Sequence, residues 1–95
     1  MATIGVVTLE LRLENSHSLK DKRHVVESLK NRLRNKFNVA VAEIDFQDLW
    51  QRSAIAVVTV SSDRENAEKV LKGAEDEAAA TLGGALISTS VEWMP

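Results

Sequence analysis

The sequence contains no cysteine and no tyrosine, and it has only one proline, four glycines, two tryptophans and two phenylalanines. Without cysteine, the chain has no disulfide framework, no thiol nucleophile and no cysteine-type zinc site. Its apolar runs are a few residues long, far below the roughly 20 residues that span a bilayer. The N-terminal residues Met1–Gly5 lack the basic segment and the long apolar stretch of a secretory signal. We therefore expect a cytoplasmic protein that makes no membrane contact.

The composition is that of a globular chain, because 44% of the 95 residues are hydrophobic and 27% are charged. The length is typical of one domain, and no repeat, low-complexity stretch or linker divides it. We therefore treat residues 1–95 as a single domain. These figures exclude fibrous and disordered classes, but they identify no reaction.

Hydrophobic spacing predicts four strands and two helices. From Val7 to Leu13 the residues alternate between apolar and polar, as in a half-buried strand. The stripe of the first helix is spaced by 7, 3, 4 and 4 residues and comprises Leu19, Val26, Leu29, Leu33 and Phe37. The predicted strands cover residues 3–13, 38–46, 52–61 and 86–94, and the predicted helices cover residues 19–37 and 63–80.

Polar residues at fixed offsets predict where the helices begin and end. Ser18 with Asp21, and Ser62 with Glu65, have the spacing of N-terminal capping boxes. Gly83-Gly84 predicts the end of the second helix, because glycine adopts a positive φ without steric penalty.

The order βαββαβ predicts a ferredoxin-like α+β fold, in which two helices cover one face of a four-stranded antiparallel sheet. The first and third strands are expected in the centre of the sheet, since the third strand is apolar on both sides. The other sheet face would then be open and partly apolar, and such a surface is usually covered. We predict homodimerisation through this face and through the loop before the third strand, with Trp50, Arg52, Ile55 and Val57 as interface residues. A monomer with a modest exposed patch is the alternative.

The first helix is strongly basic. From Leu19 to Phe37 it has seven Lys and Arg residues and two acids, whereas the chain as a whole has a net charge of −2. At 100° per residue, a single sector of the helix gathers Lys20, Arg23, Lys30 and Arg34. Such a face is expected of a protein that binds nucleic-acid phosphates. An ordinary solvated helix face is the alternative, and the acidic overall charge argues against strong sequence-independent binding to long nucleic acid.

The connection from Asp45 to Arg52 is the most distinctive local segment. Trp50 there is an amphipathic anchor suited to an interface. Glu43, Asp45 and Asp48 supply three carboxylates, but no histidine or glycine pattern supports a metal or general-acid role. We therefore assign no catalytic, cofactor or metal residues. The structural alternative is that Trp50 packs over the sheet edge while Arg52 pairs with an acid.

The aromatic residues argue against binding of RNA bases across the open sheet. Proteins that bind RNA in this way stack bases on aromatic side chains of the central strands. The four aromatic residues of this chain lie outside the predicted central strands and are Phe37, Phe46, Trp50 and Trp93.

Three stretches have a distinctive sequence: HSLKDKR at 17–23, FNVAVAE at 37–43 and DFQDLWQR at 45–52. Together they resemble the YlxP-like family of small bacterial proteins of unknown function, and the resemblance extends over essentially the whole chain. It implies a ferredoxin-like fold. Members are commonly encoded beside translation initiation and ribosome-maturation factors, which implies a role near the ribosome or its RNA. The resemblance implies no active site, so no catalytic residue is carried over.

Three hypotheses follow. The first is a non-enzymatic module that binds ribosomal RNA or a ribosomal subunit through the basic helix face, with Trp50 and Arg52 as further contacts. The second is a homodimeric protein-interaction domain that uses the open sheet face and Trp50. The third, and least supported, is an enzyme that uses Asp45, Asp48 and Arg52.

Overall fold

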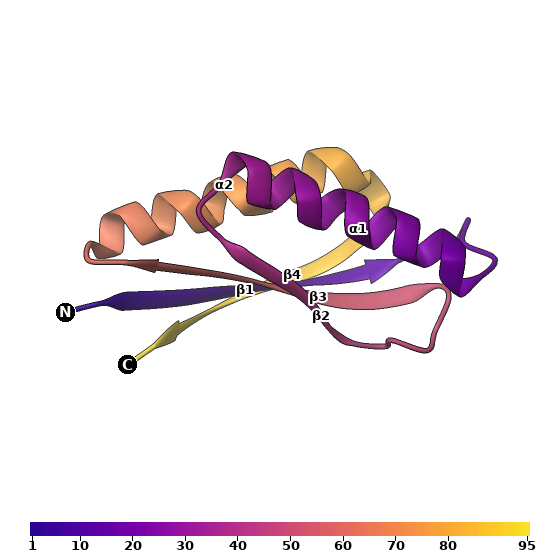
Figure 1. Cartoon of the computed structure of the whole chain (residues 1–95), viewed down its shortest axis with the longest axis horizontal. Coiled ribbons are helices and arrows are strands. Elements are labelled where there is room, and N and C mark those ends of the chain that lie inside the picture. The colour runs from indigo at the N-terminus through magenta and orange to yellow at the C-terminus, as the bar shows by residue number, and fades with distance from the viewer.

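The computed structural model describes all 95 residues and has the predicted order of elements (Figure 1). A short 3-10 turn at Gly83–Ala85 joins the second helix to the last strand. The strands are β1 (Thr3–Arg12), β2 (Ala40–Asp45), β3 (Arg52–Ser61) and β4 (Leu86–Met94), and the helices are α1 (Leu19–Lys36) and α2 (Arg64–Leu82). Neither helix is long and apolar enough to cross a membrane.

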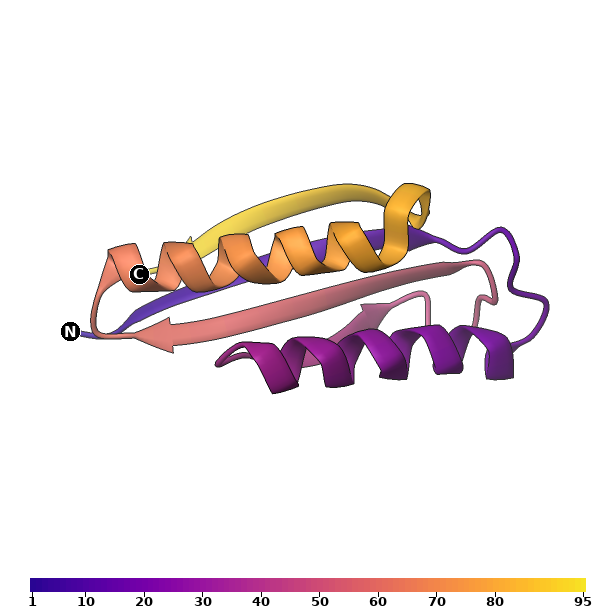
Figure 2. The same ribbon diagram turned by 90° about the horizontal axis from the view of Figure 1, so that it is seen from above.

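The four strands form one antiparallel sheet in the order β2-β3-β1-β4. Both helices lie on the same face of this sheet, as Figures 1 and 2 show from two directions. The predicted ferredoxin-like α+β fold and the central position of β1 and β3 are therefore confirmed.

The core lies between the sheet and the helices. Alternate residues of β1 point into it, so that Val7, Leu9 and Leu11 are completely buried. From α1, Leu29 and Leu33 pack against them. Burial of each such side chain contributes about 1.5–3 kcal/mol, and the alternation of β1 therefore fixes which face carries the helices.

The predicted interface residues Ile55 and Val57 are wrong, because both are fully buried in the core. In the sheet, Ile55 pairs with Leu9 and Val57 pairs with Val7, so the four side chains share the helix-covered face. Because β3 is apolar on both sides, its own sequence does not say which side points inward. The pairing with β1 decides it.

The helix ends follow local capping rules. The Ser18 side chain accepts a 3.0 Å hydrogen bond from the amide of Asp21, as predicted. At α2 the cap is Asp63, whose carboxylate accepts from the amide of Glu65, and the prediction of Ser62 is wrong by one residue. Helix α2 ends at Leu82, and its C-terminal cap is Gly83, which has a φ of 56°.

Gly5 of β1 allows the last strand and the second helix to approach the sheet closely. A Cβ atom at this position would lie 2.5 Å from Trp93 Cζ3 and 2.7 Å from Leu71 Cδ1. These contacts are far shorter than van der Waals distances. The absence of a side chain therefore lets the Trp93 ring pack over β1.

We predict that Gly5→Ala lowers the free energy of unfolding by about 1–3 kcal/mol, because the added methyl group overpacks the Trp93–Leu71 contact. Denaturant unfolding would measure the loss. Gly84→Ala is the matched control, since nothing lies within 4 Å of a Cβ at that position. The control should change stability by no more than about 0.5 kcal/mol. Equal effects of the two variants would contradict this account of Gly5.

Candidate functional site

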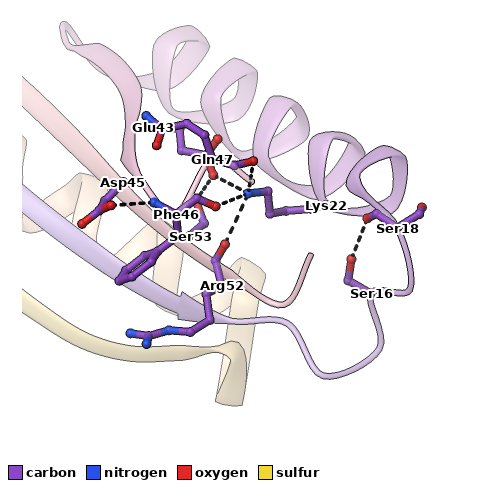
Figure 3. A network of polar contacts seen from close by, with 9 residues as sticks. All are labelled: Ser16, Ser18, Lys22, Glu43, Asp45, Phe46, Gln47, Arg52 and Ser53. Atoms are coloured by element: carbon purple, nitrogen blue, oxygen red, sulfur yellow. Dashed lines mark hydrogen bonds and ion pairs between the residues drawn. The ribbon is translucent and has the colours of Figure 1, made fainter. Parts of the chain in front are cut away.

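Lys22 of α1 is a buried charge at the base of the β2–β3 connection. Its side chain is 1% exposed, and its Nζ donates to the carbonyl oxygens of Phe46 at 2.7 Å and Gln47 at 3.1 Å. The same Nζ forms a 3.1 Å ion pair with Glu43 Oε2 and a longer contact, 3.4 Å, with the carbonyl oxygen of Arg52 (Figure 3). The ammonium group thus binds both ends of the segment that joins β2 to β3.

Glu43 completes this arrangement. Its Oε2 also accepts a 2.6 Å hydrogen bond from Ser53 Oγ, and Ser53 is fully buried (Figure 3). A buried ammonium group is tolerated only when it is paired and hydrogen-bonded. Lys22 meets this condition through Glu43 and the carbonyl groups, so it is a structural residue rather than a free cation.

The contacts of Lys22 act as one clamp on the β2–β3 connection. A second clamp joins this connection to the loop between β1 and α1. Gln51 Nε2 donates to the carbonyl oxygens of Glu14, at 3.3 Å, and Ser16, at 3.1 Å. The Gln51 carbonyl accepts from the amide of Leu13 at 2.9 Å. The chain turns at Phe46, whose carbonyl group is bound by Lys22 and whose φ of 62° is uncommon for a residue other than glycine. The two loops therefore form one unit at this end of the sheet.

The tip of this unit presents apolar side chains to solvent. Leu49 is 47% exposed and Trp50 is 53% exposed. Both line a shallow hollow together with Asp48, Gln51 and Arg52. Trp50 is therefore not buried over the sheet edge, although its backbone is held on both sides by the clamps.

Arg52 lies beside the hollow and is paired with an acid. Its Nη2 forms an ion pair with Glu10 Oε1, and its guanidinium carbon lies 4.2 Å from the centroid of the Phe46 ring. Glu10 Oε2 accepts from Ser88 Oγ at 3.2 Å. The Nε of Arg52 is buried and has no hydrogen-bond partner. Of the structural alternative, the ion pair of Arg52 with an acid is found, whereas Trp50 is not buried over the sheet edge.

The four predicted phosphate-binding residues lie on one flank of α1, but they are not equivalent. Lys20 and Arg23 are exposed and form no ion pair. Lys30 forms a 3.3 Å ion pair with Glu27, and Arg34 Nη2 donates to the side chain of Asn31 at 3.0 Å. Thus Lys20, Arg23 and Arg34 have no acidic partner, and Lys30 alone of the four forms an ion pair.

Apart from the buried Lys22, the remaining basic residues of α1 face the second helix. Lys36 and Arg32 pair with Glu77 of α2, at 2.5 Å and 3.5 Å. The hydrogen bond from Lys36 lowers the pKa of the Glu77 carboxyl below its ordinary value, and the charge of Arg32 acts in the same direction. The charge of α1 is therefore divided between a helix–helix contact on one flank and solvent on the other.

The three carboxylates near the β2–β3 connection are not brought together. Glu43 turns toward Lys22, whereas Asp45 Oδ1 accepts from the adjacent amide of Phe46 at 2.8 Å. The ladder between β2 and β3 shifts register between Glu43 and Asp45, which interrupts the regular alternation of side chains along β2. No group of three or more His, Asp or Glu side chains is placed to hold a metal ion.

The uncovered face of the sheet carries an apolar surface, which we call the open-face patch. It lies on the side of β1 and β3 opposite the core, where Ile4 pairs with Val60 and Val6 pairs with Val58. Val60 is 54% exposed. The open-face patch comprises Ile4, Val6, Ala40, Ala42, Ala56, Val58, Val60 and Met94.

Sequence reasoning missed the role of Lys22, although a signal was present. Lys22 stands four residues before Val26 and lies on the same stripe as Leu29 and Leu33, all of which are buried. A lysine that extends an apolar stripe is a candidate for a buried, paired charge. Its partners come from a segment more than 20 residues away, so the sequence did not identify them.

Comparison with known proteins gives one family and several similar folds. Residues 4–92 match the model of the family described as "Protein of unknown function (DUF503)". The chain is 42% identical over 69 residues to "Uncharacterized protein YlxP" of Bacillus subtilis (strain 168), which covers 73% of this chain and 75% of that protein.

Among solved structures, the chain is similar to two de novo designed proteins. Foldit4 has a TM-score of 0.63 at 11% identity, with 100% of this chain and 98% of that chain covered. The protein LFR1 1 with ferredoxin fold has a TM-score of 0.54 at 11% identity, with 99% and 84% covered. These two similarities concern the fold alone.

We predict that Lys22→Met lowers the free energy of unfolding by about 3 kcal/mol, because it leaves the Glu43 carboxylate and buried carbonyl groups without their partner. Chemical denaturation would measure this loss. Lys20→Met removes an exposed lysine of the same helix and should change stability by less than about 0.5 kcal/mol. A similar small effect of both substitutions would show that the Lys22 cluster contributes little.

Proposed function

This chain belongs to the DUF503 family, and from the charge distribution of α1 we propose that it is a non-enzymatic binding module that contacts RNA phosphates through the outer flank of this helix. The predicted resemblance to YlxP-like proteins is thereby confirmed. The proposed partner is ribosomal RNA or a ribosomal subunit, and the contact would take place in the cytoplasm. The proposed contact residues are Lys20, Arg23, Lys30 and Arg34.

The observation that carries this proposal is the unpaired charge of Lys20 and Arg23. A cation that already has an acidic partner gains less from a phosphate, and these two have none, whereas Arg32 and Lys36 share Glu77. Lys20 and Arg23 also lie in the first turns of α1, where the positive end of the helix dipole strengthens the attraction for an anion.

The other two residues extend the same surface. From Lys20 to Arg34 the helix rises about 21 Å, enough to follow several phosphates of an RNA strand. The ion pair of Lys30 with Glu27 joins neighbouring residues on a solvated helix face, and such pairs contribute little. A phosphate can therefore compete with Glu27 for Lys30.

Trp50 favours a partner that contains single-stranded RNA. The clamp at Lys22 holds the Trp50 loop against the first turns of α1, at the same end as Lys20 and Arg23. A half-exposed indole on a fixed loop can stack on an unpaired base, a contact common in recognition of single-stranded RNA. Arg52 lines the same hollow.

We predict that the wild type co-sediments with small ribosomal subunits at low salt and that affinity falls steeply as salt rises. Four phosphate contacts on single-stranded RNA give a slope of log K against log salt of about −3. Replacement of Lys20, Arg23, Lys30 and Arg34 by glutamate should abolish the binding. Circular dichroism would show that the fold persists.

A matched pair of variants separates the α1 flank from overall charge. Lys20→Glu/Arg23→Glu and Lys69→Glu/Lys72→Glu change the net charge equally, but the second pair lies on α2. Only the first should lose affinity. Equal losses of affinity in the two double variants would assign the effect to net charge. Absence of binding by the wild type at low salt would reject the proposal.

The second candidate function is a protein-interaction domain that packs its open sheet face against a second copy. The open-face patch favours it, because contiguous exposed apolar surface marks contact sites. Arg52 pairs with Glu10 of β1 and lines one hollow with Trp50, and both remain proposed contact residues. Ile55 and Val57 have no part in it, because they are buried under the helices.

We predict that Val60→Lys reduces the mass of the assembly in solution, since a lysine ammonium group cannot be buried between two apolar sheet faces without a partner. Multi-angle light scattering would measure the mass, and circular dichroism would show that the exposed substitution leaves the fold intact. A mass that is the same for wild type and variant would exclude the open face as a contact between copies.

A further inference from the structure

The hollow beside Trp50 contains a carboxylate that has no partner in the chain. Of the three acids near the β2–β3 connection, Glu43 binds the buried ammonium group of Lys22, and Asp45 accepts from the adjacent backbone amide. Asp48 is exposed and forms no ion pair and no side-chain hydrogen bond. It lines the hollow together with Trp50, and the hollow has a volume of about 430 Å³. The oxygens of Asp48 are therefore free to accept hydrogen bonds from a ligand.

The polar side chains that line the hollow beside Asp48 are already engaged. Gln51 Nε2 donates to two backbone carbonyl oxygens of the β1–α1 loop. The guanidinium group of Arg52 pairs with Glu10 and lies against the ring of Phe46, which Figure 3 shows beside it. The main free polar group of the hollow is therefore an acceptor, the carboxylate of Asp48.

The segment that carries Asp48 and Trp50 is held in place before any ligand binds. The amide of Leu49 donates to the carbonyl oxygen of Phe46 at 3.0 Å and closes a turn around Asp48. Lys22 binds the two carbonyl groups that directly precede Asp48. A binding group on a fixed segment loses little conformational freedom when a ligand arrives.

The four RNA bases differ in what their Watson–Crick edges offer to a carboxylate. Guanine presents two adjacent donors, the N1–H group and the N2 amino group, which match the two oxygens of one carboxylate. Adenine and cytosine each present one amino group beside a ring nitrogen that accepts, and uracil presents one N–H group between two carbonyl oxygens. A carboxylate repels these neighbouring acceptors. A free carboxylate beside an exposed indole ring is therefore complementary to guanine, whose face stacks on the ring.

We infer that the hollow binds an unpaired guanine of single-stranded RNA, with the base stacked on Trp50 and with Asp48 accepting from N1–H and from the N2 amino group. This inference rests on the proposed contact of α1 with RNA phosphates, and it names the base that the same surface selects. Phosphate contacts give affinity without sequence preference, whereas contacts to base edges give specificity. The inference also explains an acid beside a surface proposed to bind phosphates, because Asp48 repels a strand that places no guanine in the hollow.

Fluorescence anisotropy at low salt tests the preference with labelled uridine pentamers whose central base is guanine, adenine, cytosine or uracil. The wild type should bind the guanine pentamer at least about fivefold more tightly than the other three, as expected of a bidentate contact to a base edge. Asp48→Asn should bring the four affinities to within about twofold of one another, because the amide replaces one acceptor oxygen by a donor.

Asp45→Asn is the matched control for Asp48→Asn. It makes the same change in charge on the same connection, and Asp45 already accepts from a backbone amide, so this variant should keep the guanine preference. Equal affinities of the wild type for all four pentamers, or a guanine preference that survives Asp48→Asn, would overturn the inference. Salt-sensitive binding without a base preference would leave the proposed phosphate contact in place.

Nuclear magnetic resonance of the Lys20→Glu/Arg23→Glu variant separates the base contact from the phosphate contact. Guanosine monophosphate should shift the indole N–H signal of Trp50 more than adenosine monophosphate does, although the basic flank is lost. The loss of one of the two indole signals in Trp50→Phe identifies it. Equal shifts with the two nucleotides would overturn the inference. A guanine-selective shift without binding of any pentamer by the wild type would reject RNA as the source of the guanine.

Discussion

The ammonium group of Lys22 joins three parts of the molecule that the chain visits separately. It lies at the start of α1, binds the carbonyl groups of the β2–β3 connection and pairs with Glu43 of β2. Because the group is almost completely buried, these partners take the place of the water that an exposed ammonium group would bind. The position of the Trp50 loop relative to α1 therefore depends on this one cluster. Gln51 then attaches the β1–α1 loop to the same unit.

The charges of the two helices are distributed according to their surroundings. Glu77 forms ion pairs with the basic residues of α1 that face α2. On the opposite flank, Lys20 and Arg23 have no acidic partner. A net charge of −2 conceals this separation. Apolar residues are also divided between the core and the surface, because both sides of β3 are apolar and only one is covered by helices. The surface thus has a basic flank on α1, an apolar face on the sheet and an uncovered edge at β4.

Much of the fold could be predicted because periodicity is a local property. The alternation in β1 and the stripe of α1 each follow from which face is buried, and they placed the elements to within a few residues. The cap at Ser18 was predicted correctly, whereas at α2 two adjacent polar residues competed and Asp63, rather than Ser62, is the cap. The candidate site was less predictable. Val57 was assigned to the wrong face because β3 carries no alternation of its own.

The sequence by itself determined the order of elements, the central position of β1 and β3, the basic character of α1 and the family to which the chain belongs. Each of these depends on residue types at short spacing along the chain. The tertiary structure alone decided which side of β3 faces the helices, which cations of α1 are neutralised and why Lys22 is buried. These properties depend on partners that are distant in sequence. Such partners come together only when the register of the sheet and the packing of the helices bring them within contact distance.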